Sequence, residues 1–345
     1  MAPRHIIPAA VIGSWSFPGW YAHFGVEAAA HPEKFGADDR AEALRDAVRL
    51  AVDDQVRAGA DLISDGEMRR VDFNLGFYDY LAGIKPLPPM RRWGPPAHDQ
   101  RSKYVCIAEL SAPNGLGIID EYRQLVSITT HAVKVPVPGP FTLAGCIDGG
   151  AVYRDRQTVT EALAPIVNHE IKALVAEGAT FIQLDEPSFA CHPDRPDLFL
   201  DIIARTVAAV DATIGLHMCF GNYRGRAVGH RSYRPLFPHL ARANVRQLAL
   251  EFASREMAEI ELAREIRAPM ELAVGLIDVK NTWVEPPELV AQRLRTALRF
   301  IEPERLSVTP DCGFSQTARY LAIRKLTNMV AGVNIVRKEL GTPTA

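Results

Sequence analysis

The sequence predicts a single-domain α/β protein, residues 1–345, folded as a (β/α)8 TIM-type barrel with an insertion after the second strand. Short β-branched or apolar runs alternate with longer amphipathic stretches, the pattern of repeated βα units around a parallel sheet. Polar side chains gather at the ends of these runs, where barrel enzymes build their active sites. A doubly wound parallel sheet is the alternative fold.

Eight apolar runs are predicted as strands. In chain order they are Ala9–Ser14, Leu62–Glu67, Val133–Pro138, Thr180–Glu186, Thr213–Cys219, Val245–Glu251, Glu271–Leu276 and Leu306–Pro310. The longer stretches between them have helical periodicity. The predicted helices are Asp39–Ala58, Thr158–Glu177, Pro196–Val210, Pro286–Phe300 and Gln316–Val330. Gly59 and Gly178 follow two of these helices, as expected for helix ends.

The segment from Phe73 to His131 fits neither the strand nor the helix pattern. It contains the proline-rich stretches Pro86-Leu-Pro-Pro-Met and Trp93-Gly-Pro-Pro. We interpret residues 73–131 as an insertion that covers or extends the active-site face.

The amino-acid composition argues against some classes of binding partner. The 345 residues are 48% hydrophobic and 23% charged, with 39 basic and 41 acidic side chains, so binding to nucleic acid or an anionic membrane is not expected. No apolar run approaches a membrane span, and the first residues do not resemble a signal peptide. We expect a cytoplasmic protein with a small-molecule partner, whose five scattered cysteines are free thiols or metal ligands.

Seven of the predicted strands end in, or are followed by, a carboxylate, thiol, imidazole or hydroxyl group. These groups belong to Gly13-Ser14, Asp65-Gly66-Glu67, Asp185-Glu186-Pro187, His217-Met218-Cys219, Glu251, Asp278 and Asp311-Cys312-Gly313. Scattered surface polarity would rarely produce such a series, so it predicts one site at the C-terminal face of the barrel.

Four of these residues form a candidate metal site. His217 and Cys219 are two residues apart, so their side chains lie on the same side of a strand. Cys312 and Glu251 come from other strand ends, and the His-Cys-Glu-Cys set suits tetrahedral zinc. Each residue alone is typical of core packing or a turn; their joint placement favours the metal. Zinc would hold a substrate thiol as the nucleophilic thiolate.

These motifs resemble the family of cobalamin-independent methionine synthase, over nearly the whole chain but only its C-terminal catalytic half. The matching segments are Val11-Ile-Gly-Ser14, Ser64-Asp-Gly-Glu67, Gln183-Leu-Asp-Glu-Pro187, His217-Met-Cys219, Leu250-Glu-Phe252 and Pro310-Asp-Cys-Gly313. The resemblance implies one zinc ion per chain, bound by the same four residues, and methylation of homocysteine to methionine.

The resemblance also implies which residues hold the amino acid group of homocysteine. They are Ile12, Gly13, Ser14, Glu67 and Asp185. Carboxylates suit an ammonium, and backbone N–H groups suit a carboxylate. Neither Glu67 nor Asp185 has a basic partner within its motif, which favours an ammonium ligand.

The sequence departs from the folate-using members in three places. Their N-terminal half has no counterpart here, and Cys146 stands where a Trp stacks on the pterin. Asp278 and Lys280 follow the seventh strand, where those enzymes carry a proton-donating histidine. Both are candidate catalytic residues, but a lysine, with an ordinary pKa of about 10.4, cannot be assigned the acid role. We therefore expect methylcobalamin, a corrinoid protein or another non-folate methyl source as donor.

Two other functions remain open at this stage. One is alkyl transfer to a different thiol, as in the epoxyalkane coenzyme M transferases, whose acceptor has no ammonium for Glu67 and Asp185 to bind. The other is a non-catalytic zinc-binding module, which predicts a closed four-ligand site without an adjacent cavity.

Overall fold

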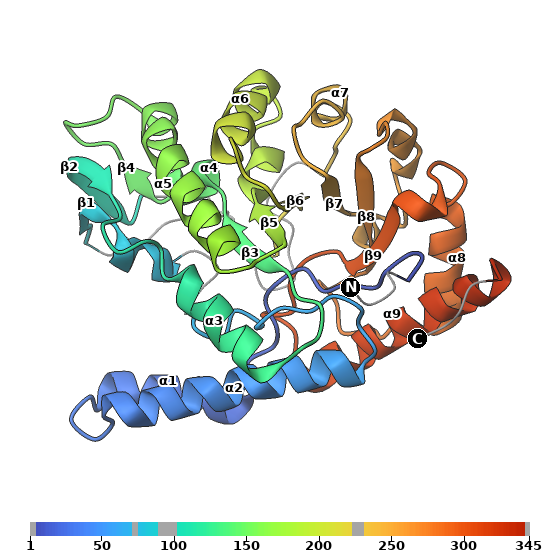
Figure 1. The fold of residues 1–345 in the computed structure, drawn as a ribbon, viewed down its shortest axis with the longest axis horizontal. Coiled ribbons are helices and arrows are strands. Elements are labelled where there is room, and N and C mark those ends of the chain that lie inside the picture. The colour runs from blue at the N-terminus through green and yellow to red at the C-terminus, as the bar shows by residue number, and fades with distance from the viewer. Residues whose placement is uncertain (1–4, 71–74, 89–101, 223–230, 342–345) are drawn as a thin grey trace.

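The computed structural model describes residues 5–70, 75–88, 102–222 and 231–341. Its main sheet contains six parallel strands in the order β3-β5-β6-β7-β8-β9 (Figure 1). These strands are β3 (Val135–Pro138), β5 (Phe181–Asp185), β6 (Thr213–Met218), β7 (Gln247–Glu251), β8 (Glu271–Ile277) and β9 (Leu306–Pro310).

Two short segments close this sheet into a ring. Ala9 forms a parallel bridge to Val308 of β9, and the adjacent Ala10 bridges to Leu62. Ile63 then bridges to Val133, directly before β3. Every segment is thereby paired on both sides, so the fold is the predicted (β/α)8 barrel.

Helices lie around the outside of the strands (Figure 1). They are α1 (Gly19–Ala30), α2 (Ala37–Arg57), α3 (Ile118–Ile128), α4 (Pro140–Ala144), α5 (Arg156–Ala176), α6 (Pro196–Thr206), α7 (Phe237–Leu240), α8 (Pro287–Ala297) and α9 (Arg319–Glu339). Short 3-10 turns are η1 (Leu75–Tyr80), η2 (Pro187–Cys191), η3 (Ala253–Arg255), η4 (Ile260–Glu265) and η5 (Pro303–Arg305). Among the described residues, none of these helices could span a bilayer.

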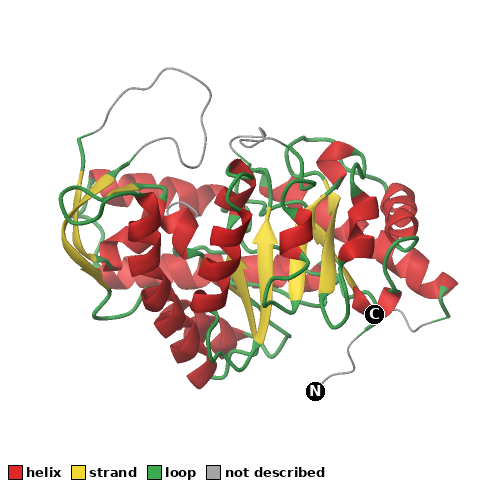
Figure 2. Ribbon diagram, turned by 90° about the horizontal axis from the view of Figure 1, so that it is seen from above, coloured by secondary structure: helices red, strands yellow, loops and turns green. Residues whose placement is uncertain are grey.

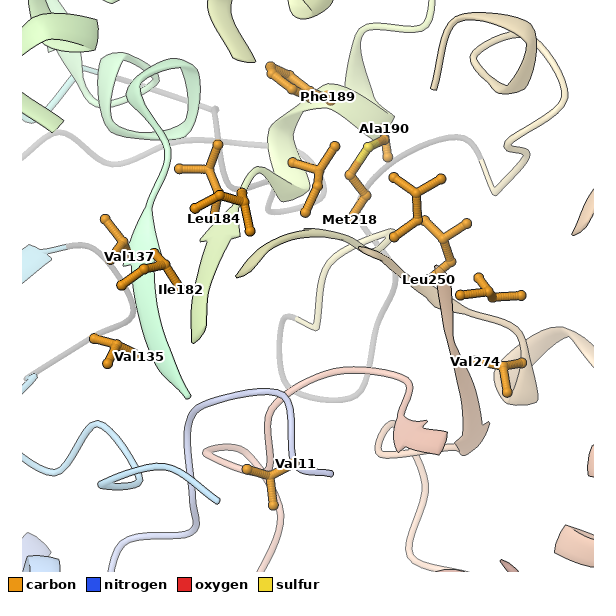
Figure 3. Close-up of a cluster of buried hydrophobic side chains, with 14 of the residues drawn as sticks. Val11, Val135, Val137, Ile182, Leu184, Phe189, Ala190, Met218, Leu250 and Val274 are labelled. Carbon is orange, nitrogen blue, oxygen red and sulfur yellow. The ribbon is translucent and has the colours of Figure 1, made fainter. Parts of the chain in front are cut away.

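The barrel strands alternate between an apolar and a polar face. Ile182 and Leu184 of β5 lie in the large hydrophobic cluster between strands and helices (Figure 3), and Gln183 between them points the other way. Gln247 Nε2 donates to Ser307 Oγ at 3.2 Å, joining β7 to β9 past the intervening β8. Side chains of alternate strands meet only inside a barrel, so the polar face is the interior.

The predicted strands Ala9–Ser14 and Leu62–Glu67 are reduced to the isolated bridges. The physical reason is Gln55 of α2, whose side-chain amide accepts from Ser64 N at 3.0 Å and donates to Ser64 O at 3.1 Å. Ser64 Oγ donates to Gly13 O at 2.5 Å. These side chains thus bond to backbone N–H and C=O groups that would otherwise pair with a neighbouring strand.

The predicted helices are present, with shifted ends. Gly59 and Gly178 have φ values of 85° and 100°, as expected for residues that end helices in the left-handed region. The last helix, predicted as Gln316–Val330, continues further as α9, because Val333 and Val336 extend its buried face.

Part of segment 73–131 forms a small sheet. Strands β1 (Ala82–Pro86) and β2 (Tyr104–Ser111) pair antiparallel, and β2 pairs with β4 (Ile147–Asp148). Figure 2 shows the paired strands β1 and β2 at one end of the molecule. Helix α3, in the same segment, contacts α2 and α5 in the outer layer. That the insertion covers the active-site face stays a prediction, as does the single-domain organisation, and residues 89–101 lie outside the described residues.

Candidate active site

Three of the four predicted metal ligands come together at the mouth of the barrel. His217 lies near the end of β6, Cys219 follows that strand, and Cys312 follows β9. A ring nitrogen of His217 and the two sulfurs all lie within 4.8 Å of one another, and the sulfurs are 3.6 Å apart. Two thiolates on one tetrahedral zinc ion, with Zn–S bonds of about 2.3 Å, lie about 3.8 Å apart. The spacing therefore suits a single zinc ion.

His217 is oriented by a chain of buried side chains. Its Nδ1 lies 2.8 Å from Asp185 Oδ1, and Gln183 Nε2 donates to the same oxygen at 2.8 Å. Lys134 Nζ donates to Gln183 Oε1 at 2.6 Å, which fixes the amide. The buried Nε2 of His217 has no hydrogen-bond partner among the residues that the structure describes. A histidine held by a carboxylate through Nδ1 presents Nε2 to a metal.

The two cysteines favour a thiolate. The pKa of Cys312 is held well below its ordinary value, because the Cys219 thiol donates to its sulfur and His217 stabilises the negative charge. The same hydrogen bond raises the pKa of Cys219 well above its ordinary value, and burial adds to this. The shared proton therefore favours negative charge on Cys312, and the thiolate is the form in which cysteine binds zinc.

Glu251, the fourth predicted ligand, is held by other groups. Its side chain is fully buried at the end of β7. Oε2 accepts from Lys280 Nζ at 2.7 Å and from Phe220 N at 3.1 Å, and Oε1 accepts from Ser254 Oγ at 2.6 Å. The carboxylate lies outside the group of three converging ligand atoms. The structure therefore places Glu251 near the other three predicted ligands without turning its carboxylate toward them.

The two candidate catalytic residues have different surroundings. Asp278 Oδ1 accepts from Lys280 N at 2.7 Å, and Asn281 Nδ2 donates to Oδ2, so Asp278 closes its own turn after β8. Lys280 points into the site and contacts Glu251, with its side chain 6% exposed. Of the two, Lys280 is the one that contacts a predicted metal ligand, Glu251.

The predicted substrate residues in segment Ala9–Ser14 pack closely against residues of the other motifs. Ile12 lies inside the barrel against Ala249 and Ala273. A β-carbon at Gly13 would overlap with the Glu67 carboxylate, and one at Gly313 would overlap with Ser14 Oγ. A larger residue at either position would have to displace the Glu67 or Ser14 side chain. The segments that contain Gly13 and Ser14, Glu67, and Gly313 therefore pack against one another at one place.

Glu67 has a basic neighbour, Arg70, which lies outside its motif. The chain turns after Gly66, where φ is positive, and this brings Arg70 Nη1 to 3.2 Å from Glu67 Oε1. Arg70 also pairs with Glu121 at 2.7 Å. Burial raises the pKa of Glu67 to about 8, although Arg70 lowers it. Without a ligand Glu67 is mostly protonated at neutral pH, and a nearby cation would favour its charged form.

Sequence reasoning missed three buried residues of the site, namely Arg70, Gln183 and Lys134. Strand alternation could have found Gln183, because it shares the inner face of β5 with Asp185. Arg70 and Lys134 gave no such signal. Their partners lie on other elements, and a turn or a strand start does not fix the direction of a long side chain.

Comparison with known proteins identifies the family. A family model described as "Cobalamin-independent synthase, Catalytic domain" matches residues 7–334. The chain belongs to this family. It is 37% identical to the methionine synthase of Thermococcus kodakarensis, over 97% of this chain and 95% of that protein. It is 31% identical to the methionine synthase of Saccharolobus solfataricus, over 99% and 98%. The chain is a methyltransferase enzyme.

Solved structures agree with this assignment. A B12-independent methionine synthase from Shewanella sp. W3-18-1, in complex with selenomethionine, superposes with a TM-score of 0.83 and 27% identity, over 97% of this chain and 99% of that chain. A methyltransferase from Methanosarcina mazei, 13% identical with a TM-score of 0.59, shares the fold.

Proposed function

We propose that the chain transfers a methyl group to the sulfur of homocysteine, giving methionine, with one zinc ion per chain. His217, Cys219 and Cys312 would bind the ion, with Glu251 as an exchangeable ligand. The observation that carries this proposal is the buried His217 Nε2, which has no hydrogen-bond partner within the described part of the chain and lies beside two cysteine sulfurs. When bound, zinc would hold the acceptor sulfur as a thiolate at neutral pH. The reducing cytoplasm, where we place the enzyme, keeps such thiols free.

Two carboxylates support an amino acid as the acceptor. Glu67 is buried and mostly neutral, so an ammonium beside it would stabilise its charged form. Asp185 Oδ1 is already bonded to His217 and Gln183, so its contact with an ammonium would use Oδ2. The backbone around Gly13 would receive the carboxylate. A coenzyme M-type acceptor has no ammonium, and the Shewanella relative was solved with a methionine analogue.

Two features support a methyl donor other than folate. Cys146, at the position of the stacking Trp, is 2% exposed, and its carbonyl accepts from Tyr104 N of β2 at 3.1 Å, directly before β4. The residue in place of the proton-donating histidine, Lys280, is paired with Glu251. Attack of the thiolate on methylcobalamin leaves the electron pair of the Co–C bond on cobalt, giving cob(I)alamin, so no proton donor is required.

A donor comparison tests the proposal. Zinc-loaded protein and homocysteine are incubated separately with methylcobalamin and with methyltetrahydrofolate monoglutamate, and methionine is measured. We expect methylcobalamin to react at least about tenfold faster, because the folate ring loses its stacking partner. Cys219→Ser should lose both zinc and methionine formation, which links the reaction to the site.

The possible results separate the parts of the proposal. Full zinc content in both Cys219→Ser and Cys312→Ser would refute the metal site. Efficient turnover with the folate and none with methylcobalamin would refute the donor assignment alone. No methionine with any donor, in a protein that retains zinc, would point to a different acceptor thiol.

A further inference from the structure

We infer that Lys280 holds the Glu251 carboxylate away from the metal position while the acceptor thiolate is bound, so that one ligand of the ion can be exchanged. The inference rests on the proposed zinc-dependent function and assigns a positioning role to Lys280. Its basis is the direct contact of the two side chains, 2.7 Å from Lys280 Nζ to Glu251 Oε2, with 6% and 0% exposure.

The Glu251 carboxylate has a complete set of donors in this position. Besides Lys280, Phe220 N donates to Oε2 and Ser254 Oγ donates to Oε1. A buried carboxylate that left a metal without new partners would carry a large desolvation cost. Here the partners are already in place, so Glu251 has a second stable position apart from the ion.

The charge of the site requires a cation near this position. Two cysteine thiolates and a carboxylate already exceed the two positive charges of a zinc ion. A substrate thiolate adds a further negative charge in a buried environment, where like charges repel strongly. Lys280 is positioned to offset this charge through Glu251 and lies close enough to Cys219 and Cys312 to interact electrostatically with both.

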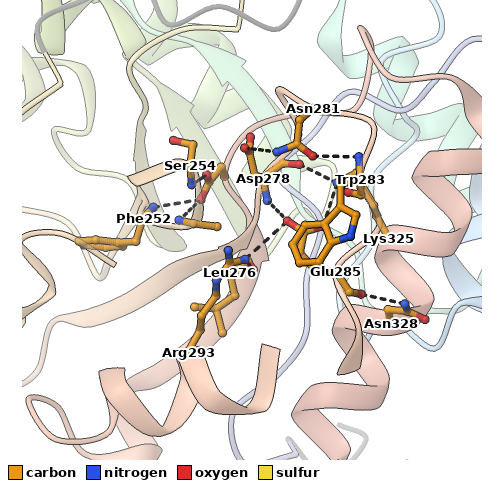
Figure 4. A network of polar contacts seen from close by, with 12 residues as sticks. Phe252, Ser254, Leu276, Asp278, Asn281, Trp283, Glu285, Arg293, Lys325 and Asn328 are labelled. Carbon is orange, nitrogen blue, oxygen red and sulfur yellow. Dashed lines mark hydrogen bonds and ion pairs between the residues drawn. The ribbon is translucent and has the colours of Figure 1, made fainter. Parts of the chain in front are cut away.

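The loop after β8 fixes Lys280 in place. Its backbone N–H is bonded to Asp278, whose own N–H donates to Glu285 Oε1 at 2.8 Å. The fully buried Lys325 donates to Asp278 O and to Glu285 Oε2, both at 2.8 Å, and to Trp283 O (Figure 4). Such a network prevents the loop from withdrawing the lysine. The amine is therefore preorganised for Glu251, unlike a lysine on a surface loop.

The inference is tested with the cobalt(II)-loaded protein, in which thiolate-to-cobalt charge-transfer absorption reports homocysteine binding directly. Variants are Lys280→Met, Lys280→Gln and Lys280→Arg, with Lys172→Met as a control for loss of one exposed lysine of α5. We expect Lys280→Met to retain one metal ion but to bind homocysteine at least about tenfold more weakly. Lys280→Gln, which keeps a hydrogen-bond donor without the charge, should be intermediate, and Lys280→Arg close to wild type.

Other outcomes would contradict either this inference or the proposed function. Wild-type homocysteine affinity in Lys280→Met would overturn the inference, and so would loss of the metal from a folded Lys280→Met protein. In the second case Lys280 would support metal binding rather than ligand exchange. Failure of the wild-type protein to bind cobalt or zinc, or to show any charge-transfer change with homocysteine, would instead refute the proposed function.

Discussion

Among the residues proposed to bind the acceptor, Glu67 gives a cleaner test than Asp185. Asp185 Oδ1 contacts His217 Nδ1, so replacing Asp185 would disturb the metal site and the acceptor together. Glu67 contacts Arg70 and the backbone near Gly13, neither of which is a proposed metal ligand. A change at Glu67 therefore reports on the amino acid group of the acceptor.

The pH dependence of ligand binding should show the titration of Glu67. Burial raises its pKa from an ordinary 4.5 to about 8, so in the free protein it is protonated below that pH. Binding of an ammonium requires the charged form and releases the proton. Methionine, which has the amino acid group but no thiol, should bind roughly tenfold more tightly per pH unit up to about pH 8 and level off above. Calorimetry across this range measures the effect.

Glu67→Gln is the matched control for this titration. It cannot release a proton, so the pH dependence below about pH 8 should largely disappear. Its affinity above that pH should fall by roughly 2–3 kcal/mol, the value of a hydrogen bond to a charged group. A wild-type pH profile in Glu67→Gln would show that the ammonium binds elsewhere.

The types of residue in the site could be predicted from the sequence, but their orientation could not. Alternation along a strand is local, so the pair His217 and Cys219 could be placed on one inner face. The orientation of Glu251 depends on Lys280, which lies on the next strand's loop, and on Ser254 in the turn that follows. Such contacts form only when the barrel closes, and the sequence pattern gives no sign of them.

At the level of elements, the loop between β8 and α8 depends on a buried ion pair. Glu285 and Lys325 are both fully buried, and their charged atoms lie 2.8 Å apart. Arg293 Nη1 lies 3.5 Å from the other Glu285 oxygen and also donates to Leu276 O (Figure 4). A buried carboxylate that loses its main cation is strongly destabilising.

Lys325→Met should therefore destabilise the protein by about 3 kcal/mol, the lower end of the range for a broken buried pair. The lower end applies because Arg293 still lies near Glu285. Urea unfolding measures the change. The double variant Lys325→Met with Glu285→Gln should recover part of the loss, because the uncompensated charge is gone. Equal stability of the single and double variants would mean that the lost carbonyl contacts, rather than the charge, set the cost.

Elements with one clear periodicity were predicted well, and those shaped by side-chain bonds were not. Strand β9 was predicted with its observed bounds because its apolar residues alternate with small polar ones facing the barrel interior. The first two barrel strands, Ala9–Ser14 and Leu62–Glu67, were predicted too long, because the Gln55 side chain bonds to the backbone of Ser64. Strands β1 and β2 lie in the proline-rich segment, where no regular pattern marked them.

For the whole molecule, closure of the barrel depends on the first strand, which has only isolated bridges to its neighbours. Arg337, a fully buried residue of α9, bonds to the segment directly before this strand. Its guanidinium donates to Ile6 O at 3.0 Å and Ile7 O at 3.1 Å, and it also pairs with Asp61, just before the second strand. One side chain of the last helix thus joins both weakly paired segments.

Arg337→Met should weaken the whole barrel rather than a single loop. Among the described residues, the change leaves Asp61 with His5, at 3.9 Å, as its neighbouring base, and it removes the donor to the carbonyls of Ile6 and Ile7. We expect a loss of about 3–5 kcal/mol in the free energy of unfolding, measured with urea. Arg295→Met in α8, which removes an exposed pair with Glu339 of α9, should change stability very little. Equal midpoints for the two variants would mean that apolar packing of α9, and not Arg337, closes the barrel.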